Sequence, residues 1–211
     1  MTTAARTRNF MTGHSTAKRE QLLQAARQTW VETNQLDMGA LAQQLGIGRA
    51  TIFRWAGSRD ALLAEVIWSF HQPDIEAALT KSKLRGAELL AHLCRCSMQA
   101  ALEFEPMRRW SESDPEYALK ILNSEQNVIF QRATAFTEQV LLREQAEGYI
   151  QPMMPLTELA RLLVRIETSF LFSDLACGQP PSIDSACTAV WVLCQARHDD
   201  ITPPQRGRAQ S

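Results

Sequence analysis

The stretch Leu41–Leu62, LAQQLGIGRATIFRWAGSRDAL, decides the fold of this chain. It contains a short helix pattern with apolar residues on one face, then Gly46 where the chain must reverse, then a second short helix pattern that begins after Gly48. Glycine suits such a reversal because it adopts a left-handed backbone conformation without steric cost. A third helix pattern opens at Ser58, a residue type that caps helices. We interpret the stretch as a helix-turn-helix motif.

The second helix of this motif, over residues 49–56, is predicted to present a small, basic and aromatic outer face. At about 100° per residue, Ile52 and Ala56 point inward, whereas Ala50 and Arg54 point outward. Small residues allow close approach to the major groove of DNA, and arginine pairs with guanine edges or with phosphate. The pattern therefore indicates a helix that reads base sequence.

The same stretch resembles the TetR family of bacterial regulators, whose members tend to read I-A-x-x-A-G-V-S-x-G-T-L-Y-x-Y-F-x-S-K-E-x-L at this place. The positions that match in register are Leu41-Ala42, Gly46-Ile47, Thr51-Ile52-Phe53, Trp55, Ser58-Arg59-Asp60 and Leu62. The residues that resemble the first helix of the family are Arg19, Leu22, Leu23, Ala25, Ala26 and Trp30, so the resemblance covers residues 16–70. The chain departs from the pattern at Gly48 in place of serine, Ala50 in place of glycine and Ala56 in place of a bulky aromatic.

Residues 54–60, RWAGSRD, also resemble the QsdR-type branch of this family, which is linked to the breakdown of lactone signals. The resemblance implies that Arg59, where the family usually has lysine, contacts a DNA phosphate beside the amino terminus of the next helix. Together, the motif and the resemblance predict that the DNA-contacting residues are Gly39, Arg49, Ala50, Thr51, Phe53, Arg54, Trp55 and Arg59.

The composition is that of an ordinary globular protein, with 211 residues of which 45% are hydrophobic and 21% charged. The formal net charge is −1, but it is unevenly distributed. Residues 1–60 carry eight Lys+Arg against four Asp+Glu, and residues 61–211 carry fourteen against nineteen. The basic excess lies with the helix-turn-helix motif, which supports a nucleic-acid partner.

The cysteines and the amino terminus favour a cytoplasmic protein without a cofactor. The five cysteines are odd in number and include no C-x-x-C pair, so neither a disulfide framework nor a zinc site is indicated. The first ten residues, MTTAARTRNF, lack the apolar core of a signal peptide. No run approaches the roughly 18 apolar residues that cross a bilayer, so we expect no membrane segment.

Apolar residues recur at helical spacing throughout, and no strand alternation or phosphate-binding loop is present. We predict an all-α chain with a three-helix helix-turn-helix DNA-binding domain over 15–57 and a helical bundle domain for effector binding and dimerisation over 58–198. A flexible basic arm is expected over 1–14 and a flexible tail over 199–211. The helix that follows Ser58 should kink or end near Gln72, because Pro73 comes next. The other predicted helices are 16–32, 86–104, 115–122, 124–147, 155–177 and 182–197.

The last two predicted helices are apolar around most of their circumference, which predicts burial on more than one side. A second copy of the chain related by a two-fold axis would supply the second side. The resemblance also implies a homodimer with a four-helix interface, which would place two reading helices on the half-sites of an inverted repeat. The residues expected at the interface are Phe172, Val190, Trp191 and Cys194. The alternative is a monomer with two central helices.

Between the motif and these helices, the resemblance implies a pocket for a small-molecule effector. Aromatic and methionine side chains suit an apolar ligand. The residues expected to line the pocket are Trp68, His71, Met98, Phe104, Met107, Trp110, Asn127, Phe130, Glu167 and Phe170. Arg165 and Glu167 stand out because they interrupt the apolar run LLVRIETSFLF, where a buried charge needs a partner or a ligand.

The motif predicts a sequence-specific transcriptional regulator, and the resemblance implies a repressor that leaves its double-stranded operator when a small apolar effector, of which a lactone is one example, binds. In that mechanism the effector shifts the helix that begins at Arg59. Three alternatives remain open: a ligand-blind regulator, a helix-turn-helix used for protein interaction, and an all-α enzyme or metal or thiol sensor. His92 and Cys96 lie four residues apart and could share a helix face, but the scattered histidines form no catalytic or metal-binding motif.

Overall fold

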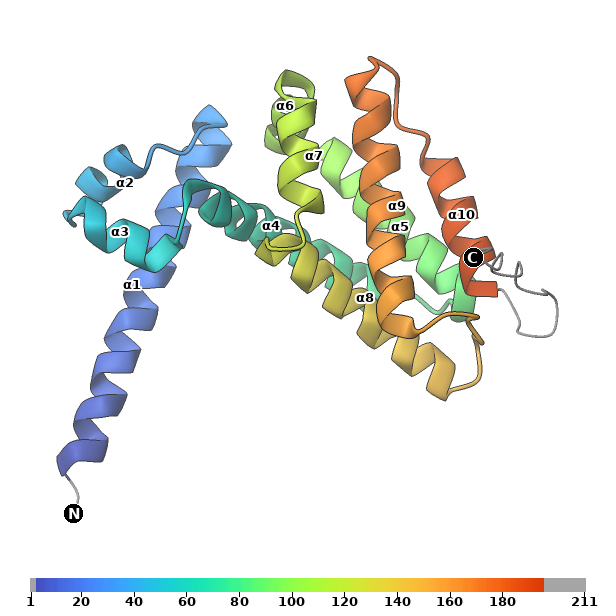
Figure 1. Cartoon of the computed structure of the whole chain (residues 1–211), viewed down its shortest axis with the longest axis horizontal. Coiled ribbons are helices and arrows are strands. Elements are labelled where there is room, and N and C mark those ends of the chain that lie inside the picture. Colours follow the sequence, from blue (N-terminus) through green and yellow to red (C-terminus); the bar gives the residue numbers. More distant parts are fainter. Residues whose placement is uncertain (1–2, 196–211) are drawn as a thin grey trace, which may run out of the picture.

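The computed structural model of the protein describes residues 3–195, which form ten α-helices and no strand (Figure 1). The all-α prediction is confirmed. The helices are α1 (Thr3–Thr33), α2 (Met38–Gln44), α3 (Arg49–Ala56), α4 (Arg59–Lys81), α5 (Gly86–Glu103), α6 (Glu105–Ser113), α7 (Pro115–Asn123), α8 (Val128–Ala146), α9 (Leu156–Ala176) and α10 (Ile183–Gln195). No helix within residues 3–195 is both long and apolar enough to cross a membrane. The predicted tail over 199–211 lies outside the described residues.

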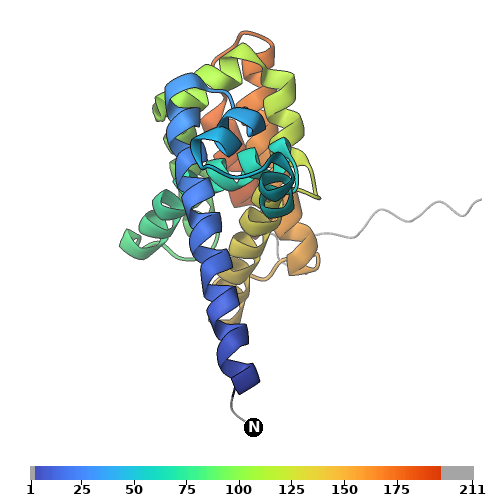
Figure 2. The same ribbon diagram turned by 90° about the vertical axis from the view of Figure 1, so that its left-hand side faces the viewer.

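Helices α1–α3, here called the helix-turn-helix module, gather at one end of the molecule (Figures 1 and 2). The carboxylate of Asp37 caps α2 by accepting from the backbone N–H of Gly39 at 2.6 Å and of Ala40 at 3.1 Å. The chain then reverses at Gly46 with a φ of 62°, the left-handed conformation that the sequence predicted. Gly48 precedes α3 without a side-chain cap. The module is thus built by its predicted turn and closed around a small apolar core.

Helix α1 begins at Thr3, where the sequence predicted a flexible arm over 1–14 and a helix from Thr16. Its amino-terminal part projects away from the rest of the molecule in both views (Figures 1 and 2). Residues 3–33 contain no proline, so nothing in the covalent chain stops the helix from continuing in that direction.

Helix α4 runs through Pro73 to Lys81, so of the two predicted outcomes, a kink or an end near Gln72, the end is wrong. Proline has no N–H with which to bond the carbonyl of Ser69, four residues earlier. In its place, Arg27 of α1 directs a guanidinium N–H toward this carbonyl oxygen at 3.5 Å, while its charge lies over the ring of Phe70 at 4.2 Å. A side chain from the helix-turn-helix module thus compensates for the break in α4.

Helices α4–α10 form the carboxy-terminal bundle, in which α5 packs against α10 and α8 packs against α9 (Figure 1). The predicted helices at 86–104, 115–122, 124–147, 155–177 and 182–197 are all present, with ends that differ by a few residues. Helix α6 was not predicted, because it is short and only its Pro106, Met107, Trp110 and Ser111 are buried. Two bonds hold it to α1: Asn34 donates to the Pro106 carbonyl at 2.6 Å, and Arg109 donates to the Val31 carbonyl at 3.0 Å.

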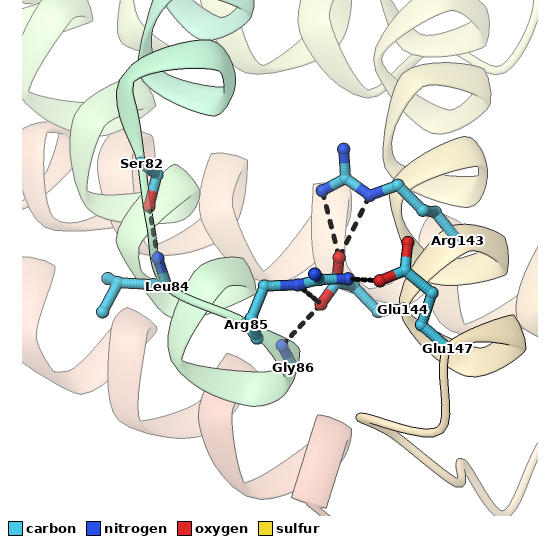
Figure 3. A network of polar contacts seen from close by, with 7 residues as sticks. All are labelled: Ser82, Leu84, Arg85, Gly86, Arg143, Glu144 and Glu147. Atoms are coloured by element: carbon cyan, nitrogen blue, oxygen red, sulfur yellow. Dashed lines mark hydrogen bonds and ion pairs between the residues drawn. The ribbon is translucent and has the colours of Figure 1, made fainter.

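A buried carboxylate fastens the α4–α5 loop to the end of α8 (Figure 3). Glu144 is fully buried and accepts from Arg85 Nε at 3.0 Å, from the Gly86 N–H at 2.7 Å and from Arg143 Nε at 3.1 Å. Burial opposes its ionisation, but these donors outweigh it and lower the pKa of Glu144. Gly86 has a φ of 59°, and a Cβ there would lie 2.8 Å from the carbonyl oxygen of Tyr149. Only glycine therefore fits this junction without a shift of the backbone.

Candidate DNA-reading surface and effector cavity

Helix α3 buries one face and leaves the other open. Ile52 is completely buried in the core of the helix-turn-helix module, while Arg54 and Phe53 are exposed, Phe53 by 43%. Arg49 and Ala50 are exposed as well, and Thr51 and Trp55 are half-buried. Among the residues whose side chains the structure describes, 18–175 and 177–195, no hydrogen bond or ion pair joins Arg54 to another residue. The structure thus places the predicted base-contacting side chains together on one accessible helix face.

Arg59, at the start of α4, is bonded within the protein. Its Nε donates to the carbonyl oxygen of Leu36 at 2.9 Å, and one terminal N–H donates to the hydroxyl of Tyr117 at 3.0 Å. That hydroxyl donates to Asp60 at 2.7 Å. Burial and the Asp60 bond raise the pKa of Tyr117 to about 12, so the phenol stays protonated. Arg59 therefore ties the helix-turn-helix module to α7, and its phosphate contact stays a prediction.

Gly39 lies at the amino terminus of α2, beside the capping carboxylate of Asp37. Its N–H is taken by that carboxylate, and a Cβ at this position would lie 3.1 Å from Asp37 Oδ1 and 3.9 Å from the Arg49 guanidinium carbon. The residue is half-buried. It brings the start of α2 close to the start of α3, and its contact with DNA stays a prediction.

A cavity of about 280 Å³ lies in the carboxy-terminal bundle next to α1. Most of its wall is apolar, and every helix from α4 to α9 contributes to it. Its lining residues are Trp30, Ile67, Phe70, His71, Asp74, Ile75, Ser97, Ala100, Ala101, Phe104, Met107, Leu122, Ile129, Phe130, Ala133, Thr137, Val164, Glu167, Thr168, Leu171 and Phe172. We call this space the effector cavity because effector binding is the role that we propose for it.

The structure brings half of the predicted pocket residues to this cavity, namely His71, Phe104, Met107, Phe130 and Glu167. The others lie elsewhere. Trp68, Met98 and Trp110 are buried in the core. Asn127, at the start of α8, donates to the carbonyl of Ile121 in α7. Phe170 is half-buried on α9. Residue type alone predicted these five side chains to line the pocket, but their positions on the helices place them outside the cavity wall.

Trp30 lines the cavity, although its sequence pattern predicts only a core residue of the first helix. It is 1% exposed and belongs to α1 of the helix-turn-helix module. Its ring packs against Phe70, Phe104 and Trp110 with centroid distances of 6.1–6.2 Å. Among the described residues its buried indole N–H has no hydrogen-bond partner. An unpaired buried donor beside a cavity could have been found only from coordinates.

Three polar side chains meet at one wall of the cavity. The Ser97 hydroxyl donates to a carboxylate oxygen of Glu167 and lies 3.2 Å from His71 Nε2. Burial raises the pKa of Glu167 to about 7, with the Ser97 bond opposing the shift. Burial also lowers the pKa of His71, with Asp74 acting in the opposite direction. The histidine is therefore neutral at pH 7, and Glu167 is poised between its charged and neutral forms.

This trio does not have the geometry of a hydrolytic triad. In a triad the acid holds the imidazole, which in turn takes the proton of the serine. Here the carboxylate of Glu167 contacts the serine, and within residues 3–195 no hydrogen bond joins a carboxylate to His71. The arrangement suits ligand recognition better than nucleophilic catalysis.

Arg165 and Glu167 separate in the structure, although both interrupt the same apolar run. Arg165 is exposed and forms an ion pair with Glu125, which also pairs with Arg161. Its predicted burial is wrong, because α9 turns this residue outward. Glu167 is half-buried on α9 and lines the cavity.

Three of the four predicted interface residues are unavailable to a partner. Phe172, Val190 and Cys194 are at most 2% exposed within the single chain, because α9 and α10 turn these residues toward α5 and the cavity. Trp191 is 38% exposed, and its neighbour Val192 is 53% exposed. The exposed face of α10 therefore centres on Trp191 and Val192, whereas the prediction placed Val190 and Cys194 there together with Trp191.

The His92–Cys96 pair shares a helix face as predicted, with 3.6 Å between Cys96 Sγ and His92 Nε2. In the described part of the chain, no group of three or more histidine, cysteine or acidic side chains is placed to hold a metal ion. Burial raises the pKa of the Cys96 thiol, with the charge of Arg95 acting in the opposite direction.

Comparison with known proteins settles the relationship. The family described as "Tetracyclin repressor-like, C-terminal domain" matches residues 85–195, which is more than half of the chain. The chain belongs to the TetR family. The transcriptional repressor QsdR of R. erythropolis, a solved structure from the TetR family, superposes on this TetR-family regulator with a TM-score of 0.78 and 22% identity. The match covers 88% of this chain and 98% of that chain. No curated protein matches significantly.

Proposed function

We propose that this TetR-family protein is a DNA-binding repressor that leaves its operator when a small molecule fills the effector cavity. The observation that carries the proposal is the place of Trp30. It belongs to the helix-turn-helix module, yet it lines the cavity. A ligand in the cavity would therefore touch both the helix-turn-helix module and the carboxy-terminal bundle. The division into domains at residues 15–57 and 58–198 remains part of the proposal.

In this proposal the outer face of α3 enters the major groove. Ala50, Thr51 and Arg54 contact base edges, and Arg49 at the start of the helix reaches a base or a phosphate. Phe53 and Trp55 contact sugars or thymine methyl groups. The exposure of the first residues of α3 supports these roles, because base contacts come from the amino-terminal part of a recognition helix.

We propose that two copies of the chain bind an inverted repeat. The face that remains for a partner lies on α9 and α10, where apolar side chains are exposed or half-buried: Leu162, Ile166, Phe170, Trp191, Val192 and Leu193. Replacement of both Trp191 and Val192 by aspartate should give a monomer in analytical ultracentrifugation. Leu142, exposed on α8 by 51%, provides the matched control, since L142D should leave a dimer.

The effector would act by changing the orientation of the module relative to the bundle. Three connections cross between them: Arg27 to α4, Asn34 and Arg109 between α1 and α6, and Arg59 to Leu36 and Tyr117. A ligand that moves α4 or α6 would move α3 through these bonds. A coupling of about 1–3 kcal/mol per effector would change DNA affinity by about 5–150-fold.

A mobility shift tests the proposal with duplexes that carry inverted repeats from upstream of the protein's own gene. We expect specific binding whose logarithm falls steeply and linearly with the logarithm of the salt concentration. Absence of salt-dependent binding to DNA would favour a protein-interaction module instead. Specific binding that no small molecule weakens would identify a ligand-blind regulator.

A further inference from the structure

The charged side chains in the wall of the effector cavity are acidic, and the nearest guanidinium groups, those of Arg27 and Arg165, lie over the rings of Phe70 and Phe130. Its titratable lining residues are His71, Asp74 and Glu167, and no lysine or arginine belongs to the wall. His71 adds no positive charge, because burial keeps its imidazole neutral. An anionic ligand would meet carboxylates in this cavity and would find no cation in the wall to balance it.

Glu167 has room for a donor that the protein does not supply. An ionised carboxylate accepts through two oxygens, each with two lone pairs. Ser97 donates to one oxygen, and no donor from residues 18–175 or 177–195, whose side chains the structure describes, bonds the other. A carboxylate with an open acceptor in a largely apolar cavity is costly unless a ligand or a proton supplies the missing partner.

The rest of the wall suits an apolar body. Aromatic rings of Trp30, Phe70, Phe104, Phe130 and Phe172 enclose the space, together with aliphatic side chains of α5, α8 and α9. Aromatic faces attract organic cations as well as apolar groups. The cavity thus combines a carboxylate at one wall with rings at the others.

We propose that the effector is an organic amine or ammonium compound with an apolar body, bound with its nitrogen against the carboxylate of Glu167 and its body among the aromatic rings. This inference names the chemical class of the ligand in the proposed function. It rests on that function only in the claim that the bound amine controls DNA binding. It replaces a purely apolar ligand with a cationic one.

The protonation of Glu167 gives this proposal a distinctive pH dependence. The titratable and polar groups around Glu167 are His71 and Asp74 from α4, Cys94 and Ser97 from α5, Thr137 from α8, Thr168 from α9 and Cys187 from α10. None of them is cationic at neutral pH. Because the carboxyl has a pKa of about 7, an ammonium ligand must displace its proton at lower pH. Affinity for an amine should therefore rise several-fold between pH 6 and pH 8.

Isothermal titration calorimetry on the full-length protein without DNA tests the proposal with a matched probe series. The probes are 4-phenylbutylamine, 4-phenylbutan-1-ol and 4-phenylbutanoate, with γ-decalactone as a neutral acceptor. At pH 8 we expect the amine to bind at least tenfold more tightly than each of the others. E167Q should remove this preference, and E158Q, which changes an exposed carboxylate of the same helix, should keep it.

Equal or tighter binding of the alcohol, the carboxylate or the lactone would overturn the proposal, and so would absence of binding by all four probes. If E167Q does not fold, the pH series on the wild-type protein decides: amine affinity that is flat or falls toward pH 8 contradicts it. Binding of the amine without any effect on operator affinity would refute the repressor mechanism alone, so the two failures are distinguishable.

Discussion

Arg27 and Ser69 form a bond that exists because residue 73 is proline. The guanidinium N–H of Arg27 lies 3.5 Å from the Ser69 carbonyl, the acceptor that an ordinary residue at position 73 would have satisfied within α4. The same segment of α4 supplies Phe70, His71 and Asp74 to the effector cavity. The point at which α4 is weakest is therefore held by the helix-turn-helix module and borders the ligand space.

We expect R27A to lower the free energy of unfolding by about 1 kcal/mol, because it leaves the Ser69 carbonyl without a donor. P73A restores a helical N–H to that carbonyl. In the P73A background, R27A should therefore lower the free energy of unfolding by clearly less. Urea unfolding of the four proteins of this double-mutant cycle measures the difference. Equal costs in both backgrounds would show that Arg27 does not compensate for the proline.

The buried Glu144 predicts a loss of stability in acid. Its pKa is lowered in the folded state, so it stabilises the fold above its unfolded pKa of about 4.5, and this contribution is lost as pH falls through the folded value. E144Q should lower the free energy of unfolding by about 2 kcal/mol at pH 7 and by less at pH 4. E147Q, a change at a more exposed partner of Arg85, is the control. A deficit of E144Q that is independent of pH would contradict the assignment.

Glu167 predicts the opposite trend. Because its pKa is raised in the folded state, the neutral carboxyl favours folding at low pH, and this advantage is lost as pH rises from about 4.5 through about 7. A shift of this size corresponds to about 3 kcal/mol. E167Q should therefore be as stable as the wild type near pH 5 and more stable at pH 8. Urea unfolding between pH 5 and pH 8 measures the difference in unfolding free energy between the two proteins. If the wild type becomes more stable relative to E167Q as pH rises, the assignment is wrong.

Replacement of Trp30 should change ligand affinity while leaving the stability of the fold nearly unchanged. W30F retains a ring in the apolar contact with Phe70 and Phe104 but removes the indole N–H, which has no partner among the described residues. We expect an unfolding free energy within about 1 kcal/mol of wild type, since no bond is lost. Affinity for 4-phenylbutylamine should change several-fold, whereas W110F, at a buried tryptophan that does not line the cavity, should bind it as the wild type does. Identical affinities in W30F and wild type would place Trp30 outside the site.

The sequence predicted the architecture well where local chemistry determines it. The glycine at position 46, the cap at Ser58 and the apolar spacing of α5, α9 and α10 each specify a local structure, and the helices appear where these signals lie. Helix α6 was missed because its formation depends on contacts with α1, such as Asn34 to Pro106, that join residues distant in the sequence. The passage of α4 through Pro73 depends in the same way on Arg27.

The cavity was harder to predict than the reading helix. The outward face of α3 follows from helical periodicity alone, and Arg54 is exposed as predicted. The lining of the cavity depends on how seven helices meet, so residue type could select Glu167 and Phe130 but also selected Trp68 and Phe170, which face elsewhere. Ser97 and Trp30 gave no signal in the sequence, since a serine and an apolar-face tryptophan are common in helices.

The most direct measurement is the affinity of R54A for a panel of operator variants with single base-pair changes, compared with R108A, a change at an exposed arginine on α6. We predict that R54A binds the intact operator more weakly by about 1–3 kcal/mol and loses discrimination at one base pair in each half-site. R108A should behave as the wild type. If R54A and R108A bind all variants with the same affinities as the wild type, the outer face of α3 does not read DNA.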